Sequence, residues 1–91
     1  MITIELPRSL IGPNDKGTIV LQENFRTVGD AIRALETHTP AAIDSVLDER
    51  GNLRQHVNVF LNAENTRFLN GLDTPAPDGS RIFVIGAISG G

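Results

Sequence analysis

One helical segment lies between segments that alternate as β-strands do, and this pattern limits the possible folds more than any other feature. Val28, Ile32 and Leu35 recur at helical spacing and give that segment a single apolar stripe. Thr27 is placed to cap its start, and we expect it to end near His38. One main helix can cover only one face of a sheet, so the pattern predicts an α+β fold.

Short segments on both sides of that helix alternate between apolar and polar residues, which is typical of half-buried strands. The expected strands cover residues 2–6, 18–21, 57–61 and about 81–87, with a short edge strand at 66–68. Thr39-Pro40 begins a second, shorter helical segment, and turns are expected at 12–17 and 62–65. The predicted core comprises the inward-facing apolar residues of these elements: Ile2, Ile4, Ile19, Val28, Ile32, Leu35, Val59, Leu61, Ile82 and Val84.

Length and cysteine content restrict both the organisation of the chain and its chemistry. Its 91 residues suit one domain, which we place at 1–88 with a flexible tail at 89–91. No cysteine is present, so the chain offers no disulfide and no thiolate for catalysis or metal binding. The first residues carry neither a basic flank nor a long apolar run. We therefore expect no signal peptide or membrane anchor, and a cytoplasmic location.

Charge and aromatic content argue against a nucleic-acid partner. The net charge is −3, the basic residues are spread singly along the chain, and Trp and Tyr are absent. Neither an electrostatic stripe nor a stacking platform for bases is expected from such a sequence. His38 and His56 are too few and too isolated to form a metal site. No Gly-rich phosphate loop with Lys-Ser/Thr occurs, so any ATP chemistry belongs to a partner.

The sequence closes with Gly90-Gly91, directly after the last expected strand. Glycine has no Cβ, so such a segment can enter a narrow active site that other residues could not. A terminal carboxylate on this thin stalk is then a chemical handle. The alternative interpretation is an unanchored end with no function.

Several motifs in the second half of the chain resemble the family of ubiquitin-like sulfur carriers that includes ThiS, MoaD and CysO. The resemblance covers most of the chain, and the segment 57–71 is most similar to the CysO branch. It implies a ubiquitin-like β-grasp: a mixed sheet of four to five strands covered on one face by a main helix and a short second helix. The motifs are Val57-Asn58-Val59-Phe60-Leu61-Asn62-Ala63-Glu64, Arg67-Phe68, Gly71-Leu72-Asp73-Thr74, Asp78-Gly79 and Ala87-Ile88-Ser89-Gly90-Gly91.

The resemblance also implies a chemistry for the tail. A partner related to ubiquitin-activating enzymes would use ATP to adenylate Gly91, and sulfur would displace AMP to give a thiocarboxylate. Gly90 and Ser89 would form the approach to that carbon. The chain would be a co-substrate with no catalytic side chain and no stably bound cofactor. Gly86 and Ser89 depart from the family tail, which often reads Pro-Ala-Val-Ala-Gly-Gly, and this departure bears on the subfamily.

A docking surface for the partner is predicted from strand parity. If Ile82 and Val84 face the helix, then Phe83 and Ile85 face the opposite side of the sheet. The same argument places Phe60 on that side, on the neighbouring strand. These three residues are expected to form an exposed apolar patch beside the tail, as is typical of an interface.

Four functions remain open at this point. The leading hypothesis is a sulfur carrier for biosynthesis, of cysteine through a PLP-dependent cysteine synthase, with thiamin thiazole and molybdopterin as competing destinations. The second is the small subunit of molybdopterin synthase, whose tail would enter the large subunit. The third is a ubiquitin-like modifier joined through Gly91 to lysines of other proteins. The fourth is a β-grasp binding module whose glycines do nothing, since fold alone does not determine function.

Overall fold

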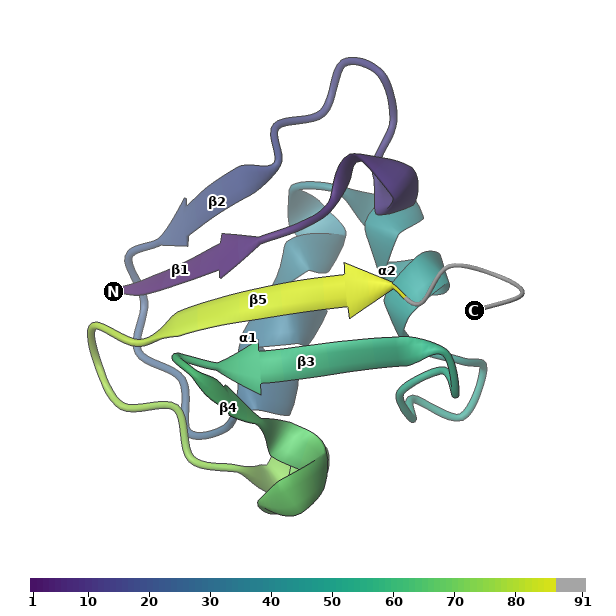
Figure 1. Ribbon diagram of the computed structural model, residues 1–91. Helices are drawn as coiled ribbons and strands as arrows, with labels where there is room; N and C mark the ends of the chain where they lie inside the picture. The colour runs from purple at the N-terminus through teal and green to yellow at the C-terminus, as the bar shows by residue number, and fades with distance from the viewer. Residues whose placement is uncertain (87–91) are drawn as a thin grey trace.

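The computed structural model describes residues 1–86, in which five strands form one mixed sheet with helices packed on one face (Figure 1). The strands are β1 (Ile2–Glu5), β2 (Thr18–Leu21), β3 (Val57–Leu61), β4 (Glu64–Asn65) and β5 (Arg81–Gly86). The α-helices are α1 (Val28–Arg33) and α2 (Pro40–Val46). Four short 3-10 helices complete the fold: η1 (Arg8–Leu10), η2 (Ala34–Thr37), η3 (Thr66–Phe68) and η4 (Gly71–Asp73).

The sheet has the order β2-β1-β5-β3-β4, with β1 and β5 paired in parallel at its centre and the other neighbours antiparallel. Ile4 lies opposite both Ile19 and Ile82 in the register, and all three side chains face the helices. Successive strand residues point to opposite faces, so the alternation seen in the sequence becomes one buried face and one open face. The predicted ubiquitin-like β-grasp is confirmed.

The helical layer begins where the sequence indicates. The Thr27 hydroxyl accepts a hydrogen bond of 3.1 Å from the Asp30 amide, which caps α1. After Arg33 the segment tightens into the 3-10 helix η2, and this ends at Thr37, as predicted for a helix stopping near His38. α2 begins at Pro40, the favoured position for proline in a first turn.

The predicted core is buried except at Leu61. The structure adds residues that the prediction omitted, and Leu61 is only partly buried because it lies beside β4, which has two residues. A short edge strand shields less of its neighbour than a full strand would. The added buried apolar residues are Leu6, Leu21, Ala31, Ala42, Val46, Leu47, Val57 and Ala76.

The prediction for residues 62–68 was wrong in its assignment of strand and turn. The edge strand is Glu64–Asn65, within the expected turn, and residues 66–68 form η3 instead of a strand. Thr66 is buried and its hydroxyl donates a 2.8 Å hydrogen bond to the Val59 carbonyl. The Asn65 side chain accepts a 3.0 Å bond from the Arg67 amide. These two side-chain bonds bend the backbone away from the sheet just after β4.

The described residues share one hydrophobic core, while the predicted domain boundary at residue 88 lies outside them. The last predicted strand is β5, which ends at Gly86. Its expected extension to Ala87 also lies outside residues 1–86. Within that same range, no helix is long and apolar enough to cross a membrane.

Candidate docking face

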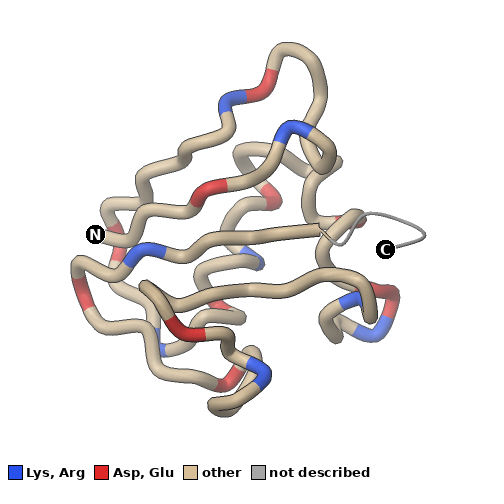
Figure 2. The backbone as a smooth tube through the Cα atoms, in the orientation of Figure 1, with Lys and Arg blue, Asp and Glu red and all other residues tan. Residues whose placement is uncertain are grey.

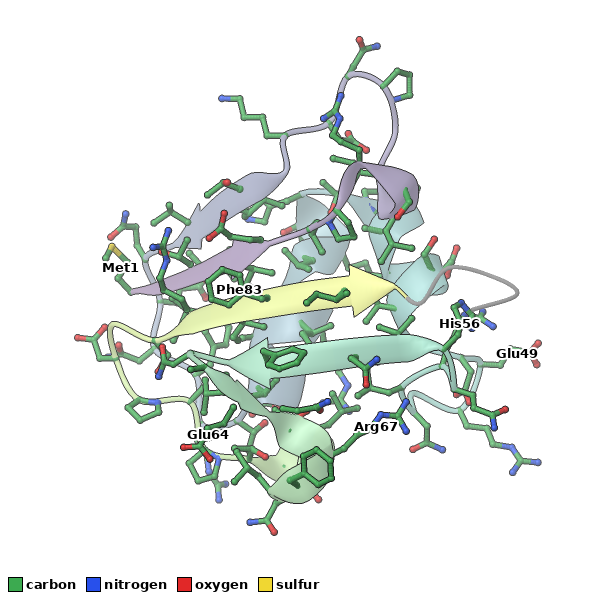
Figure 3. All side chains as sticks on the ribbon, in the orientation of Figure 1. Met1, Glu49, His56, Glu64, Arg67 and Phe83 are labelled. Atoms are coloured by element: carbon green, nitrogen blue, oxygen red, sulfur yellow. The ribbon has the colours of Figure 1, made fainter. Side chains whose placement is uncertain are left out.

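The open face of the sheet carries a groove of about 380 Å³ over its centre. Its floor is made by the outward-facing residues of β5 and β3, and the end of β1 forms one wall (Figure 3). Within residues 1–86, no helix covers this side of the sheet (Figure 1), so the groove opens directly to solvent. It is lined by Glu5, Leu6, Pro7, Phe60, Asn62, Phe83, Val84 and Ile85.

Phe60, Phe83 and Ile85, the three residues predicted to form an apolar patch, lie together in this groove. Phe60 and Phe83 are directly opposite one another on β3 and β5, which is the cross-strand position where side chains make contact. Both rings are half-buried, whereas Ile85 is 49% exposed. The arrangement offers two adjacent aromatic rings with one more exposed aliphatic side chain beside them on the same face.

Two charged residues flank the aromatic floor, and parity arguments on single strands did not find them. The parallel register places Glu5 of β1 opposite Phe83 of β5. Arg81 pairs with Glu5 at 3.2 Å, and its guanidinium carbon lies 5.9 Å from the centre of the Phe83 ring. At that distance a guanidinium is attracted to the ring face. The apolar floor therefore has a polar rim, which is the usual anatomy of an interface.

Arg67 holds the end of the sheet from which the tail departs. Its Nε donates a 2.9 Å bond to Oδ1 of Asn58, and Nη2 donates to the carbonyls of Gln55 and Val57 at 2.7 and 3.1 Å. Val57 is the register partner of Gly86, the last residue of β5. Three carbonyl oxygens satisfied by one guanidinium fix the start of β3 beside that point. Within the chain, Arg67 therefore has a structural role.

The remaining predicted site residues fall outside the described part of the chain. Gly91, Gly90 and Ser89 are among residues 87–91, so their roles stay predictions. What the structure places is the point of departure: Gly86 follows Ile85 directly, at the edge of the groove. The side chain of Leu10 approaches Gly86, with its Cδ2 atom 3.7 Å from where a Cβ would stand.

Charged groups elsewhere on residues 1–86 form no acid/base pair in a cleft and no metal-binding cluster. Figure 2 shows acidic and basic residues interspersed around this part of the backbone. Hydrogen bonds from the Asn52 and Arg50 amides hold the pKa of Asp48 below its ordinary value, and contact with the Met1 amino group does the same for the pKa of Asp78. Neither carboxylate has an acid or base partner in a cleft. No cluster of metal-ligating side chains exists over the range described.

Comparisons with known proteins agree on one family. The model of the ThiS family matches residues 7–91. The sulfur carrier protein CysO of Mycobacterium tuberculosis (strain H37Rv) is 28% identical over 92 residues, covering 99% of this chain and 98% of that protein. The family match runs through the Gly90-Gly91 end, and the CysO match spans nearly the whole of both chains.

Solved structures give the same result at the level of the fold. SAMP1 from Haloferax volcanii superposes with a TM-score of 0.80 at 28% identity, covering 99% of this chain and 98% of that one. CysO in the BexX/CysO complex of Amycolatopsis orientalis matches with a TM-score of 0.79 at 26% identity, and both chains are covered completely. The neighbours thus include a carrier solved with a partner and a protein of the SAMP type.

Proposed function

Because this chain belongs to the ThiS family of sulfur carriers, we propose that Gly91 is the group on which it carries sulfur. The carboxylate of Gly91 attacks the α-phosphate of ATP in a partner enzyme, which gives an acyl-adenylate and releases pyrophosphate. A sulfur nucleophile then displaces AMP and leaves a thiocarboxylate. The observation that carries this proposal is the family match over residues 7–91, which includes Gly90-Gly91.

In this proposal, the residues of this chain bind the partner enzyme and present the C-terminal tail to it, and the catalytic groups belong to the partners. Phe60, Phe83 and Ile85 supply the apolar contact, and Glu5 with Arg81 supplies the polar rim. β5 carries this surface and also leads to the tail, so one rigid strand sets the distance between the docking contact and the reacting carbon. We propose that the ubiquitin-activating-like enzyme docks here, and that ATP is bound by that enzyme alone.

For the destination of the sulfur, we propose the biosynthesis of cysteine in the cytoplasm. The support is the similarity of segment 57–71 to the CysO branch, together with the CysO relative that matches over the full length. The acceptor would be a PLP-dependent cysteine synthase. The alternative destinations are molybdopterin synthase and thiamin thiazole formation. Measuring sulfur transfer from the purified thiocarboxylate to each acceptor would distinguish the three.

Intact-mass analysis tests the carrier chemistry. The chain, produced with its own C-terminus beside its activating enzyme, should gain the mass of a sulfur-for-oxygen exchange. Deleting Gly91 should abolish the gain, while the control Asp30→Asn, on the helical side of the sheet, should leave it unchanged. A chain that never gains this mass in the presence of an active partner and ATP would refute the proposal.

A second candidate function is protein modification, favoured by one observation: the similarity to SAMP1. In that case the activated Gly91 would be attacked by a lysine amine of another protein, which would form an isopeptide bond and release AMP. Digestion of cell extracts with trypsin followed by mass spectrometry would reveal lysines bearing the C-terminal fragment of this chain. Such conjugates without any thiocarboxylate would favour the modifier over the carrier.

A further inference from the structure

The outer edge of β2 has backbone groups that no described strand pairs with. The Leu6 amide bonds the Gly17 carbonyl at 2.7 Å, which fixes the hydrogen-bonded pairs of the β1–β2 ladder. Since such pairs alternate along an antiparallel ladder, Ile19 and Leu21 bond to β1. The amides and carbonyls of Thr18 and Val20 therefore point outward from the sheet. Such an edge is a template for another extended segment.

A groove of about 490 Å³ runs along this free edge. Thr18, Ile19 and Val20 form one wall, and the opposite wall is the junction between η2 and α2, at His38 and Thr39. The Thr39 hydroxyl oxygen is buried and has no hydrogen-bond partner among residues 1–86. An unused acceptor in the wall of a groove is a place where an incoming amide could bond after a rotation of the side chain.

The end of the groove beside the start of β2 carries one cationic side chain. Lys16, the only lysine of the chain, lines it, and His38 stands across from it. Asp15 also lines the groove, but one of its carboxylate oxygens accepts a 2.9 Å bond from the Gly12 amide within its own turn. No salt bridge over the described range uses Lys16. A segment that ends in a carboxylate at this point would have the Lys16 ammonium as its ion-pair partner.

We propose that this groove receives the C-terminal segment of a second copy of the chain, as an added antiparallel strand. A strand antiparallel to β2 has its C-terminal end beside Thr18, and this places the Gly91 carboxylate near Lys16. The edge of β2 spans about 13 Å, whereas the five residues 87–91 can extend to about 17 Å. Four of these five residues, Ala87, Ser89, Gly90 and Gly91, are small, and Ile88 is the one large side chain that the groove would have to accept.

The chain's own tail would reach this edge with too little length left to pair along it, and it would arrive in the wrong direction. Phe83 lies opposite Glu5, and Glu5 lies opposite Thr18, so Gly86 and Lys16 are at the same end of the sheet. Crossing from β5 past β1 and β2 to the new edge takes three strand spacings, or about 14 Å, of the tail's reach of about 17 Å. A tail arriving from there would also run parallel to β2, with its carboxylate leading away from Lys16.

Binding of a synthetic peptide tests this proposal on the full-length chain. The peptide comprises residues 86–91 with a free carboxylate, and the readout is the set of backbone amide resonances of the ¹⁵N-labelled protein. We expect shifts at residues 16–20 and 38–39. The same peptide with a C-terminal amide should bind about two- to five-fold more weakly, and so should the free acid to Lys16→Gln, because one exposed ion pair is lost. Arg33→Gln, an exposed cation on α1, is the control and should bind as the parent does.

Three outcomes of the peptide titration would overturn the proposal: no shift at millimolar peptide, equal binding of the acid and the amide, or shifts confined to the Phe60/Phe83 groove. Diluting the labelled protein alone separates the tail from another occupant. If residues 18–20 respond to concentration equally in the parent and in Lys16→Gln, the edges of two β2 strands are pairing instead, and the proposal fails. None of these measurements uses an activating enzyme, so the thiocarboxylate chemistry can hold while this inference fails, and the reverse.

Discussion

The two faces of the central sheet are built from the same five strands, yet they serve different ends. On the covered face, Ile2, Ile4, Val59 and Ile82 are fully buried under the helices. On the open face, Phe60 and Phe83 are half-buried and Ile85 is half-exposed. A residue of the covered face buries its apolar surface within the chain and so stabilises the fold. An open-face residue leaves much of its apolar surface exposed, where a partner could bury it. If a partner docks on the open face as proposed, stability and recognition are separable by parity along a single strand.

The largest effect is expected from a truncation on the covered face. Ile4→Ala removes a side chain with no solvent exposure, between β2 and β5, and should lower the free energy of unfolding by about 2–5 kcal/mol. Urea denaturation followed by circular dichroism measures this loss. The matched open-face change, Ile85→Ala, should cost under about 1 kcal/mol. Equal losses for the two variants would break the comparison.

The next effect concerns the layer that covers the buried face. Gly29 of α1 lies against η4, and a Cβ at this position would stand 3.0 Å from both Cβ and the carbonyl oxygen of Leu72. Gly29→Ala should destabilise the fold by about 1–3 kcal/mol through overpacking, despite the better helix propensity of alanine. Thermal unfolding would detect it. A rise in the melting temperature would mean that η4 moves away from the added methyl group without loss of stability.

A truncation on the open face should spare the fold and weaken recognition. Phe83→Ala removes the ring opposite Phe60, and we expect the rate of thiocarboxylate formation at low carrier concentration to fall by roughly five- to thirty-fold, which is typical of an interface anchor. The check is a concentration series with the activating enzyme. Because the loss is one of binding, it should shrink at saturating carrier. A fall confined to the saturated rate would place Phe83 outside the docking surface.

Arg67 sharpens the comparison, because it is an exposed residue whose bonds lie within the chain. Arg67→Ala leaves two carbonyls and Asn58 to water and should cost about 1 kcal/mol of stability. Arg33→Ala, an equally exposed change that loses only the 3.5 Å contact with Asp30, should cost less. Chemical denaturation of both variants decides. If the two variants unfold alike, the guanidinium network at the start of β3 contributes nothing to stability.

The smallest effect is expected from acid. The folded-state pKa values of Asp48 and Asp78 lie below their ordinary values, so the stability that these groups contribute is present above the unfolded-state pKa near 3.8 and is lost as pH falls through the folded-state values. Both groups are exposed, so the shift in urea midpoint between pH 6 and pH 3 that they cause should be slight. The double variant Asp48→Asn with Asp78→Asn should therefore show a slightly smaller total shift in urea midpoint than the parent. The shift that remains would come from the other carboxylates.

Local patterns predicted those parts of the fold that depend on the period of a single segment. The alternation around Ile4, Val59 and Val84 indicated which face each residue occupies, and so it also indicated the position of Phe60 and Phe83 on the other side. The cap at Thr27 was equally visible, because it depends on residues three positions apart. The rest required contacts between distant segments.

The errors and omissions share that physical cause. η3 forms because the Thr66 hydroxyl reaches the Val59 carbonyl on the neighbouring strand, a contact between two elements that the pattern of neither one contains. The polar rim of the proposed docking face depends on the parallel pairing of β1 with β5, since this register brings Glu5 to Arg81. The groove at Lys16 joins a loop to a helix junction that is far away in the sequence. In each case the residues are visible in the sequence, but the tertiary pairing that brings them together is not.

The parallel register of β1 and β5 also limits what an activated end of this molecule can react with. Thr3 lies beside Arg81, so the α-amine of Met1 and the departure point at Gly86 are separated along the sheet by about seven residues, or roughly 23 Å. Five residues reach about 17 Å from Gly86, which falls short of that amine. The geometry of the sheet therefore prevents head-to-tail ring closure, so an acyl group of the kind proposed for Gly91 would not be lost to the chain's own α-amine.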